Sequence, residues 1–271
     1  MVIPRTNWVI IILVMLMLFL ITWFGGDGGV IPSIVSAIAN SVIGGVVALL
    51  FEVAKTHGQG YRIWLQSRFC KKDERIRVSF SYLFRICIDG KYLLVRGNRL
   101  KNQYQPIGGV YKYYPEAKVF LESIGYIPDV KMGNNDETDD LRLTIKRRCL
   151  PEFIEWFQSL INREYDPLRE FWEELIETKI LPAQEFRLIK YRKVHVHNQG
   201  IKYSTYNSCN ELVYADIFEL ELTSGQISII KQALEVNPDK VCLVSTEEIE
   251  KLCYNGIEKN LGTNTPWILE G

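Results

Sequence analysis

The stretch Arg169-Glu170-Phe171-Trp172-Glu173-Glu174 decides how this chain of 271 residues folds. We predict that it lies in a helix over residues 168–180, where apolar residues recur at helical spacing. Positions i, i+3 and i+4 of a helix share one face, so Glu170, Glu173 and Glu174 point the same way. Carboxylate oxygens grouped in this manner suit Mg²⁺ or Mn²⁺, which in turn bind diphosphate oxygens. The three glutamates are therefore candidate catalytic residues and candidate metal ligands.

Three further segments accompany this stretch in a fixed order along the chain. Residues 84–95 contain the turn Asp89-Gly90, a strong signal for a β-hairpin. Residues 104–110 contain a Gly-Gly pair, and residues 244–248 read as a strand that leads into a helix. Together with the glutamate stretch, these segments resemble the Nudix family, whose signature helix reads R-E-U-x-E-E with U apolar. The resemblance covers about residues 78–271 and implies a Nudix-like α/β (α+β) domain.

The sequence also departs from the Nudix pattern. In the family the glycines come shortly before the signature helix, whereas here roughly 60 residues separate Gly109 from Arg169, so an insertion over about residues 111–162 interrupts the motif. The position eight residues before Arg169, where the family has an acid, is Ile161. The glycine expected after the helix is replaced by Leu175-Ile176-Glu177. We therefore expect Mg²⁺ as the sole cofactor, if there is one, and little or no hydrolase activity.

Two uncharged apolar segments stand at the start of the chain. Trp8–Phe24 and Val30–Phe51 are joined by five residues, and each approaches or exceeds the roughly 20 apolar residues that a membrane-spanning helix needs. The first 51 residues carry only Arg5 and Asp27, although the whole chain has 32 basic and 32 acidic residues. The sequence thus predicts an α-helical transmembrane hairpin over residues 1–54. The alternative for the first segment is a cleaved signal peptide, since a basic residue precedes it.

A basic segment follows the expected hairpin. Residues 55–77 carry seven Lys and Arg against Asp73 and Glu74. Because basic residues mark the cytoplasmic side of membrane proteins, we expect a multi-pass protein with both termini in the cytoplasm and a juxtamembrane connector over residues 55–77. The six cysteines show no pairing pattern or CxxC spacing, which agrees with a reducing compartment.

Small residues recur in the second apolar segment. Ser33, Ala37, Ser41 and Gly45 lie four residues apart, a spacing that lets helices approach closely in lipid. Asn40 lies near the middle of the segment and needs a hydrogen-bonding partner there. This face can pack against the first segment or against hairpins of other subunits, and both alternatives stay open.

Basic and aromatic side chains alternate along the strands expected in the domain. Cationic and stacking groups together suit phosphates and bases, although a charged solvent-exposed face is the alternative for any one residue. His195 and His197 place two imidazoles on one face of a strand, where a phosphate or polar contact is favoured over zinc because no third ligand stands nearby. The candidate nucleotide-binding residues are Tyr82, Arg85, Arg96, Arg192, His195 and His197.

Hydrophobic patterns define the remaining elements. They predict strands over residues 78–88, 91–96, 141–147, 185–197, 212–222 and 241–244. They predict helices over residues 152–161 and 224–236, and a further helix from Thr246. For the signature helix, Asp166-Pro167 provides the cap and the first turn.

A membrane hairpin fused to an interrupted Nudix-like domain is similar to the two-transmembrane, CD-NTase-associated effectors of bacterial cyclic-oligonucleotide anti-phage signalling (CBASS). That resemblance implies a cGAS/DncV-like nucleotidyltransferase that supplies a cyclic oligonucleotide, which the Nudix-like domain senses. It also implies ligand-induced homo-oligomers, disruption of the bacterial inner membrane and abortive cell death. The expected partners are the cyclic oligonucleotide, the lipid bilayer and further copies of the chain, without DNA. The alternatives are a membrane-tethered, Mg-dependent Nudix hydrolase of nucleoside diphosphate derivatives and a membrane-anchored adaptor.

Overall fold

The structure is a computed structural model that describes residues 44–45, 60, 62–97, 103–129 and 139–269. The chain divides into two compact units. The larger unit comprises residues 75–146 and 159–271, and the smaller unit comprises residues 147–158 and the segment up to Glu74. All residues of the Nudix-like motif therefore belong to the larger unit.

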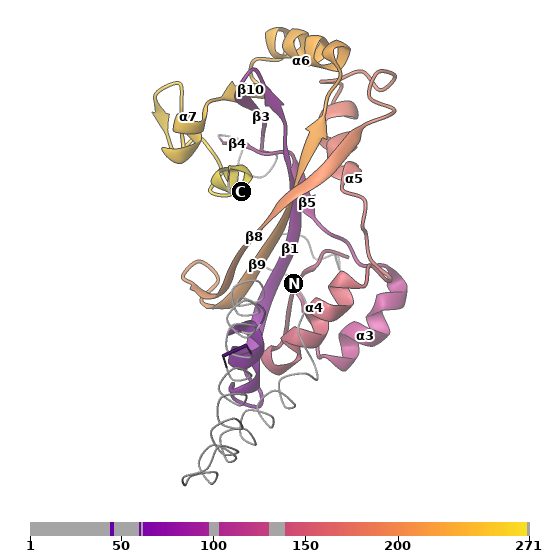
Figure 1. Ribbon diagram of the computed structural model, residues 1–271, viewed down its shortest axis with the longest axis vertical. Helices are drawn as coiled ribbons and strands as arrows, with labels where there is room; N and C mark the ends of the chain where they lie inside the picture. The colour runs from indigo at the N-terminus through magenta and orange to yellow at the C-terminus, as the bar shows by residue number, and fades with distance from the viewer. Residues whose placement is uncertain (1–43, 46–59, 61, 98–102, 130–138, 270–271) are drawn as a thin grey trace, which may run out of the picture. The chain divides into compact units, whose positions relative to one another are not determined.

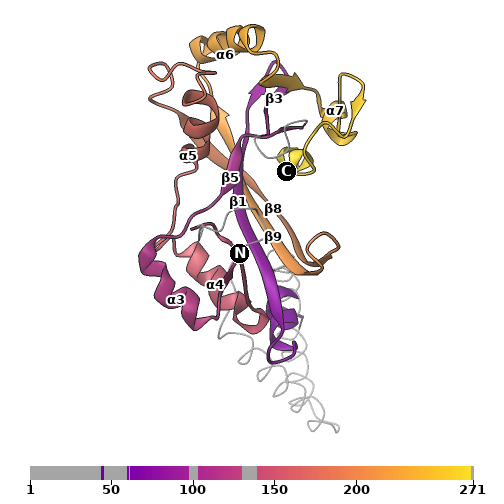
Figure 2. The same cartoon turned by 180° about the vertical axis from the view of Figure 1, so that it is seen from behind.

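A mixed sheet forms the centre of the larger unit (Figure 1). Its strand order is β6-β7-β1-β9-β8, and β5 also pairs with β1. β1 runs parallel to β9 and antiparallel to β5 and β7. Figure 2 shows β1, β9 and β8 side by side from behind. The strands are β1 (Arg75–Arg85), β5 (Gly108–Val110), β6 (Ile127–Pro128), β7 (Arg142–Lys146), β8 (Lys190–Ser204) and β9 (Cys209–Glu221).

Aromatic and serine side chains alternate along β1, so the two faces of this strand differ in burial. Successive strand residues point to opposite faces of a sheet, so Phe80, Tyr82 and Phe84 bury their rings on one face, each at most 1% exposed. Ser79 and Ser81, on the other face, are only partly buried. The first face therefore builds the core, and the second is left for a surface feature.

A second sheet holds the predicted hairpin, in the order β10-β3-β2, and β4 also pairs with β3. Asp89 and Gly90 have positive φ angles of 51° and 77°, as a tight hairpin turn requires. The hairpin prediction is thus confirmed, although the expected strand over residues 78–88 breaks at Ile86 into β1 and β2. The strands are β2 (Cys87–Ile88), β3 (Lys91–Arg96), β4 (Tyr104–Gln105) and β10 (Val241–Val244), with β11 (Cys253–Tyr254) and β12 (Ile257–Glu258) forming a separate pair.

Capping boxes fix the start of two C-terminal helices in the larger unit. α6 (Ser224–Val236) begins after Thr223, whose side chain accepts a hydrogen bond from the backbone N–H of Gln226. α7 (Thr246–Glu250) begins after Ser245 in the same way. Both helices begin where the sequence places them, because the capping residues fix the helix starts locally.

The segment over residues 111–162 contributes to both units. In the larger unit it holds the 3₁₀-helix η1 (Pro115–Ala117), the helix α3 (Lys118–Ser123), β6 and β7. β7 pairs with β1 along five residues, from Arg75↔Lys146 to Ser79↔Arg142. This segment therefore extends the main sheet.

Two helical segments characterise the smaller unit. Residues 62–68 are helical, and α4 (Leu150–Gln158) follows the 3₁₀-helix η3 (Arg147–Cys149). Phe153 and Phe157 on α4 are at most 2% exposed, as an amphipathic helix requires. The helix expected over residues 152–161 thus begins and ends earlier.

The predicted transmembrane hairpin and the multi-pass location in the inner membrane are corrected here. No helix of the described part of the chain is long and apolar enough to cross a membrane. α6 has 13 residues, whereas a span needs about 20 apolar ones. Of residues 1–54 only Gly44 and Gly45 are described, as helical, so the rest of the expected hairpin, including its small-residue face, lies outside the described residues. The fold class is therefore stated for the Nudix-like α/β domain alone.

Candidate functional site

The signature helix begins where the sequence predicts and ends earlier. The Asp166 carboxylate accepts a hydrogen bond from the Leu168 N–H at 2.9 Å, which caps the first turn. α5 (Leu168–Phe171) then continues as the π-helix η4 (Trp172–Ile176), where Glu177 N–H donates to the Trp172 carbonyl. Lys179 has a φ of 58°, which no continuing helix allows. Single π-turns are frequent at functional sites, and residues 168–176 are called the Nudix helix below.

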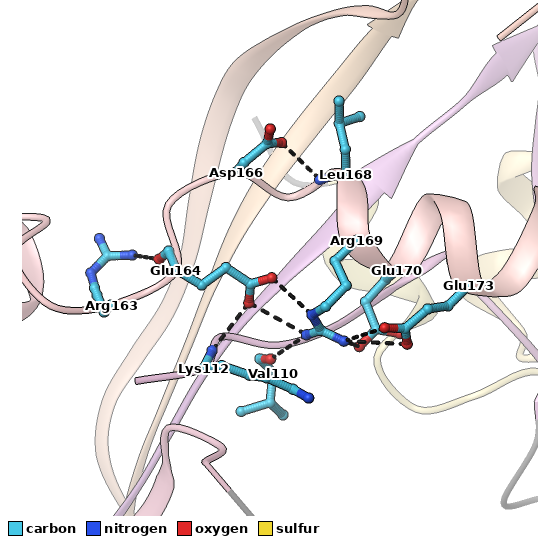
Figure 3. A network of polar contacts seen from close by, with 9 residues as sticks. All are labelled: Val110, Lys112, Arg163, Glu164, Asp166, Leu168, Arg169, Glu170 and Glu173. Carbon is cyan, nitrogen blue, oxygen red and sulfur yellow. Dashed lines mark hydrogen bonds and ion pairs between the residues drawn. The ribbon is translucent and has the colours of Figure 1, made fainter. Parts of the chain in front are cut away.

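Arg169 ties this helix to the rest of the domain (Figure 3). Its Nε donates to Glu164 at 2.8 Å, and its terminal nitrogens donate to Glu170 at 2.7 Å and to the Val110 carbonyl at 3.0 Å. The nitrogen that donates to Glu170 also lies 3.3 Å from each carboxylate oxygen of Glu173. A guanidinium presents several donors in one plane, so a single side chain can join three acids and a strand carbonyl.

Glu164 serves as the acid that the Nudix pattern places before the helix. It is 7% exposed, whereas Ile161, at the expected position, is 60% exposed. Glu164 is brought there by backbone pairing, because its N–H donates to the Lys112 carbonyl at 2.8 Å and its side chain accepts from the Lys112 N–H at 3.1 Å. After the inserted segment the chain thus pairs with Lys112, just beyond β5, and places an acid five residues before Arg169 instead of eight.

The Gly-Gly pair lets the helix approach the sheet. A Cβ on Gly109 would lie 1.9 Å from a carboxylate oxygen of Glu170, and a Cβ on Gly108 would lie 2.2 Å from the Tyr82 carbonyl. Gly108 has a φ of 150°, and its N–H donates to Glu174 at 3.2 Å. A side chain at Gly108 would push β5 away from β1, and a side chain at Gly109 would displace the Glu170 carboxylate of the Nudix helix.

The carboxylates of the helix differ in electrostatics. Burial, with a further contribution from the charge of Glu170, raises the pKa of Glu174 to about 8, and the Gly108 N–H opposes this only in part. Burial also raises the pKa of Glu170, against the pull of Arg169. Near neutral pH, Glu174 therefore holds a proton for much of the time, which reduces the repulsion within the cluster.

The three glutamates do not fit a Mg²⁺ site as they lie. Arg169 holds both Glu170 and Glu173, and Glu174 accepts from the Gly108 N–H. Among the described residues, no three His, Cys, Asp or Glu side chains are grouped so that they could hold a metal ion. Mg²⁺ binding by Glu170, Glu173 and Glu174 stays a prediction, and no metal-dependent chemistry follows from this arrangement.

A cleft of about 460 Å³ lies against the Nudix helix. Its helix wall consists of Arg169, Glu170, Glu173 and Glu174. Its sheet wall consists of Ser79, Ser81 and Leu83 of β1, Val213 of β9, Arg142 of β7, and Lys112, Asp140, Asn264 and Trp267. Gln105, Gly108, Gly109 and Val110 complete the lining. The cleft is thus built on the polar face of β1, with Arg142 beside Ser79 and Ser79 beside Val213 in the sheet register.

The two predicted histidines lie behind Trp267. The His195 Nε2 is 2.8 Å from the Trp267 carbonyl oxygen. The His197 ring stacks on the indole, with ring centroids 4.2 Å apart and planes 10° apart. Both imidazoles come from β8 and meet the 3₁₀-helix η5 (Thr265–Ile268) near the end of the chain.

None of the six predicted nucleotide-binding residues lines this cleft. Tyr82 is fully buried in the core. Arg85 pairs with Glu219 at 3.1 Å, and Arg192 pairs with the same glutamate from the neighbouring strand. Arg96 lines a separate cleft of about 440 Å³ with Lys240, and Glu174 lines both clefts.

Sequence reasoning missed four residues of the site: Lys112, Arg142, Glu164 and Trp267. Glu164 could have been found as the acid nearest to the expected position. Arg142 belongs to a predicted strand, but the pairing of that strand with β1 has no local signal. Lys112 and Trp267 reach the cleft through contacts between residues far apart in the chain, which no spacing encodes.

The hairpin, the Gly-Gly segment and the R-E-x-x-E-E helix together make the larger unit a Nudix-type α/β domain. A family model described as "SMODS-associated NUDIX domain" matches residues 75–269. The chain belongs to this family, which fits a CBASS-type effector and a cyclic nucleotide ligand from a nucleotidyltransferase. Comparisons with curated proteins and with solved structures gave no significant match.

Proposed function

We propose that this domain senses a cyclic oligonucleotide, which binds in the cleft between the helix wall and the sheet wall. The observation that supports it best is the composition of the sheet wall. This wall brings Lys112, Arg142 and Trp267 to one cleft, and the Glu170 and Glu173 carboxylates of the helix wall are hydrogen-bonded to Arg169. Cations and an aromatic ring are the groups that bind phosphates and bases.

The phosphates of the ligand bind to Lys112 and Arg142. Lys112 is exposed, and among the described residues no acid pairs with its ammonium group. Arg142 lies in the row Arg142–Ser79–Val213 across three strands, so its position is fixed by the sheet. A guanidinium held in this way forms paired hydrogen bonds with phosphate oxygens.

Binding proceeds without efficient hydrolysis. A metal-dependent Nudix reaction needs carboxylates that are free to hold the cation, and here Glu170 and Glu173 are hydrogen-bonded to Arg169. The ligand therefore acts as a signal, and binding favours a self-associated state of the chain. Membrane disruption is not part of this proposal.

Binding of defined ligands to the full chain tests the proposal. Calorimetric titration with cyclic di-AMP, cyclic di-GMP, 3′3′-cGAMP and cyclic tri-AMP is expected to give saturable binding of at least one of them. Arg142→Ala is expected to weaken that binding about 10- to 100-fold, as for loss of a charge-assisted hydrogen bond. The matched control is Arg192→Ala, because Arg192 lies outside the cleft and its side chain is 60% exposed.

Light scattering with and without the bound ligand tests self-association. The proposal is wrong if none of the four cyclic oligonucleotides binds. It is also wrong if the chain rapidly hydrolyses ADP-ribose with Mg²⁺, which would favour the hydrolase alternative.

A further inference from the structure

Trp267 lies between a buried imidazole and the cleft. Its indole stacks on His197 with centroids 4.2 Å apart and nearly parallel planes. His197 is 1% exposed and does not line the cleft, whereas Trp267 does. The imidazole therefore backs the indole from the side of the protein.

The backbone around Trp267 is held in place. The His195 Nε2 lies 2.8 Å from the Trp267 carbonyl oxygen, and the Trp267 backbone N–H donates to the Asn264 carbonyl at 3.2 Å. The next residue, Ile268, is fully buried in the core cluster. An aromatic ring fixed in this manner has little conformational freedom to lose when a ligand binds.

We propose that Trp267 is the base-stacking residue of the cleft, where its indole, backed by His197, receives a nucleobase of the bound nucleotide. This inference rests on the proposed function and adds how the base is recognised. Base–aromatic stacking tolerates any base, because every base has a π-face. His195 and His197 are then positioning residues that act through Trp267.

The lining of the cleft includes groups that suit a base and groups that suit a phosphate. Leu83 and Val213 supply apolar contacts, and the Asn264 amide can both donate to and accept from the edge of a base. Lys112 and Arg142 line the same cleft for the phosphates. A cleft of about 460 Å³ is within the usual range for small-ligand sites.

Trp267 also packs against the core cluster that contains Leu83 and Ile268. If it had only this structural task, its replacement would lower stability and would affect all ligands equally. The decisive measurement is therefore one that depends on the base of the ligand.

The experiment compares a base-bearing probe with a base-free one on the full chain. The base-bearing probe is whichever of cyclic di-AMP, cyclic di-GMP, 3′3′-cGAMP or cyclic tri-AMP binds tightest, and the base-free probe is inorganic triphosphate. Trp267→Ala is expected to weaken binding of the cyclic oligonucleotide about 10- to 100-fold and to change binding of triphosphate less than about twofold. His197→Ala is expected to weaken binding of the cyclic oligonucleotide about threefold. His197→Phe keeps a ring stacked on the indole and is expected to restore this affinity.

Fluorescence keeps the test valid if Trp267→Ala does not fold. Stacking of a base on an indole quenches its emission, so the cyclic oligonucleotide is expected to quench the wild type and not Trp267→Phe. The matched control is Trp156→Phe, which removes an indole that packs on Phe153 in the smaller unit. This variant is expected to keep the quench.

The outcomes separate the two proposals. Equal affinities of wild type and Trp267→Ala for the cyclic oligonucleotide, or equal losses for both probes, overturn the stacking role and leave the proposed function intact. If no cyclic oligonucleotide binds the wild type, the proposed function fails. In that case, quenching of the wild type but not of Trp267→Phe by AMP would still support the stacking role, and absence of quenching would overturn it.

Discussion

The helix wall and the sheet wall of the cleft use their polar groups in opposite ways. On the helix wall, Arg169 pairs with Glu170 and Glu173 and also with the nearby Glu164, so these three carboxylates share one cation within the protein. On the sheet wall, Lys112 and Trp267 present a cation and an aromatic ring to the cleft. The difference teaches that a conspicuous motif can position a site while other residues supply its binding groups.

Close pairing of β5 with β1 depends on Gly108, whose N–H also donates to Glu174 of the helix wall. Gly108→Ala is expected to lower the free energy of unfolding by about 4 kcal/mol, because it adds backbone strain to an overpacked contact. The Cβ would meet the Tyr82 carbonyl at 2.2 Å, in a backbone with a φ of 150°. Gly90→Ala is the control, since Gly90 has a φ of 77° with no atom near the added Cβ, and about 1 kcal/mol is expected there. Similar losses in urea denaturation of the two variants would contradict this account of the Gly-Gly pair.

Among the side chains of the helix wall, Arg169 is expected to contribute most to the stability of the fold. Arg169→Ala leaves Glu164 and Glu170 without their cation, and breaking a buried pair costs about 3–5 kcal/mol. Because the Arg169 side chain is 24% exposed, we expect a loss near the lower end of that range, about 3 kcal/mol, by urea denaturation. Arg169→Lys should recover only part of it, since an ammonium group cannot join three acids and a carbonyl. For comparison, Arg192→Ala removes a 60% exposed partner and should cost less than about 1 kcal/mol. A small loss of unfolding free energy in Arg169→Ala would mean that the contacts of Arg169 with the acids contribute little to the stability of the fold.

The sequence allowed us to predict which residues form the helix wall, but not the backbone geometry that positions them. R-E-x-x-E-E carries its spacing in the sequence, so Glu170, Glu173 and Glu174 could be assigned to one helix face from the pattern alone, and the structure places all three in the lining of the cleft. The π-turn after Phe171 could not, because a wider turn is decided by packing of Leu175 and Ile176 in the core. Glu164 also escaped prediction, since backbone pairing with Lys112 sets its place.

The sheet wall was hardly predictable at all. Trp267 is a single residue near the end of the chain, and its position depends on η5 packing beside β8 through His195 and His197. Those two histidines could be assigned to one strand face by their spacing, but the contact they make spans about 70 residues of sequence. Long-range contacts of this kind leave no periodic signal.

The raised pKa of Glu174 makes the helix wall sensitive to pH. In the folded state this carboxyl titrates at about 8 instead of the usual 4.5, so the folded protein binds more protons than the unfolded chain between these two values. The contribution of Glu174 to stability is therefore fully present below about pH 4.5 and is lost as the pH rises toward 8, by at most about 1.4 kcal/mol per pH unit.

The measurement for Glu174 is the difference in unfolding free energy between wild type and Glu174→Gln at several pH values. The glutamine variant lacks the titration, so its stability relative to wild type should rise steadily from pH 5 to pH 8. Glu248→Gln is the control, because the pKa of Glu248 is shifted the other way: burial is the largest single effect and raises it, but hydrogen bonds from Ser245 and Asn255 and the charge of Lys91 together lower it. A difference in unfolding free energy that stays constant with pH would show that the pKa of Glu174 is not raised.

The smallest effect is expected at Glu173, and it separates the helix wall of this chain from that of a hydrolase. Glu173 is the most exposed acid bound to Arg169, with a side chain 45% exposed and contacts of 3.3 Å. An exposed ion pair contributes less than about 1 kcal/mol, so Glu173→Gln should change stability by about 0.5 kcal/mol or less and should leave cyclic-oligonucleotide binding unchanged. Loss of a carboxylate that holds a catalytic metal ion would instead lower turnover by orders of magnitude. Hydrolysis of ADP-ribose with Mg²⁺ should therefore be slow in the wild type and equally slow in Glu173→Gln. Rapid turnover that disappears in the variant would mean that the motif carboxylates leave Arg169 to bind metal, and the two walls would then share one catalytic task.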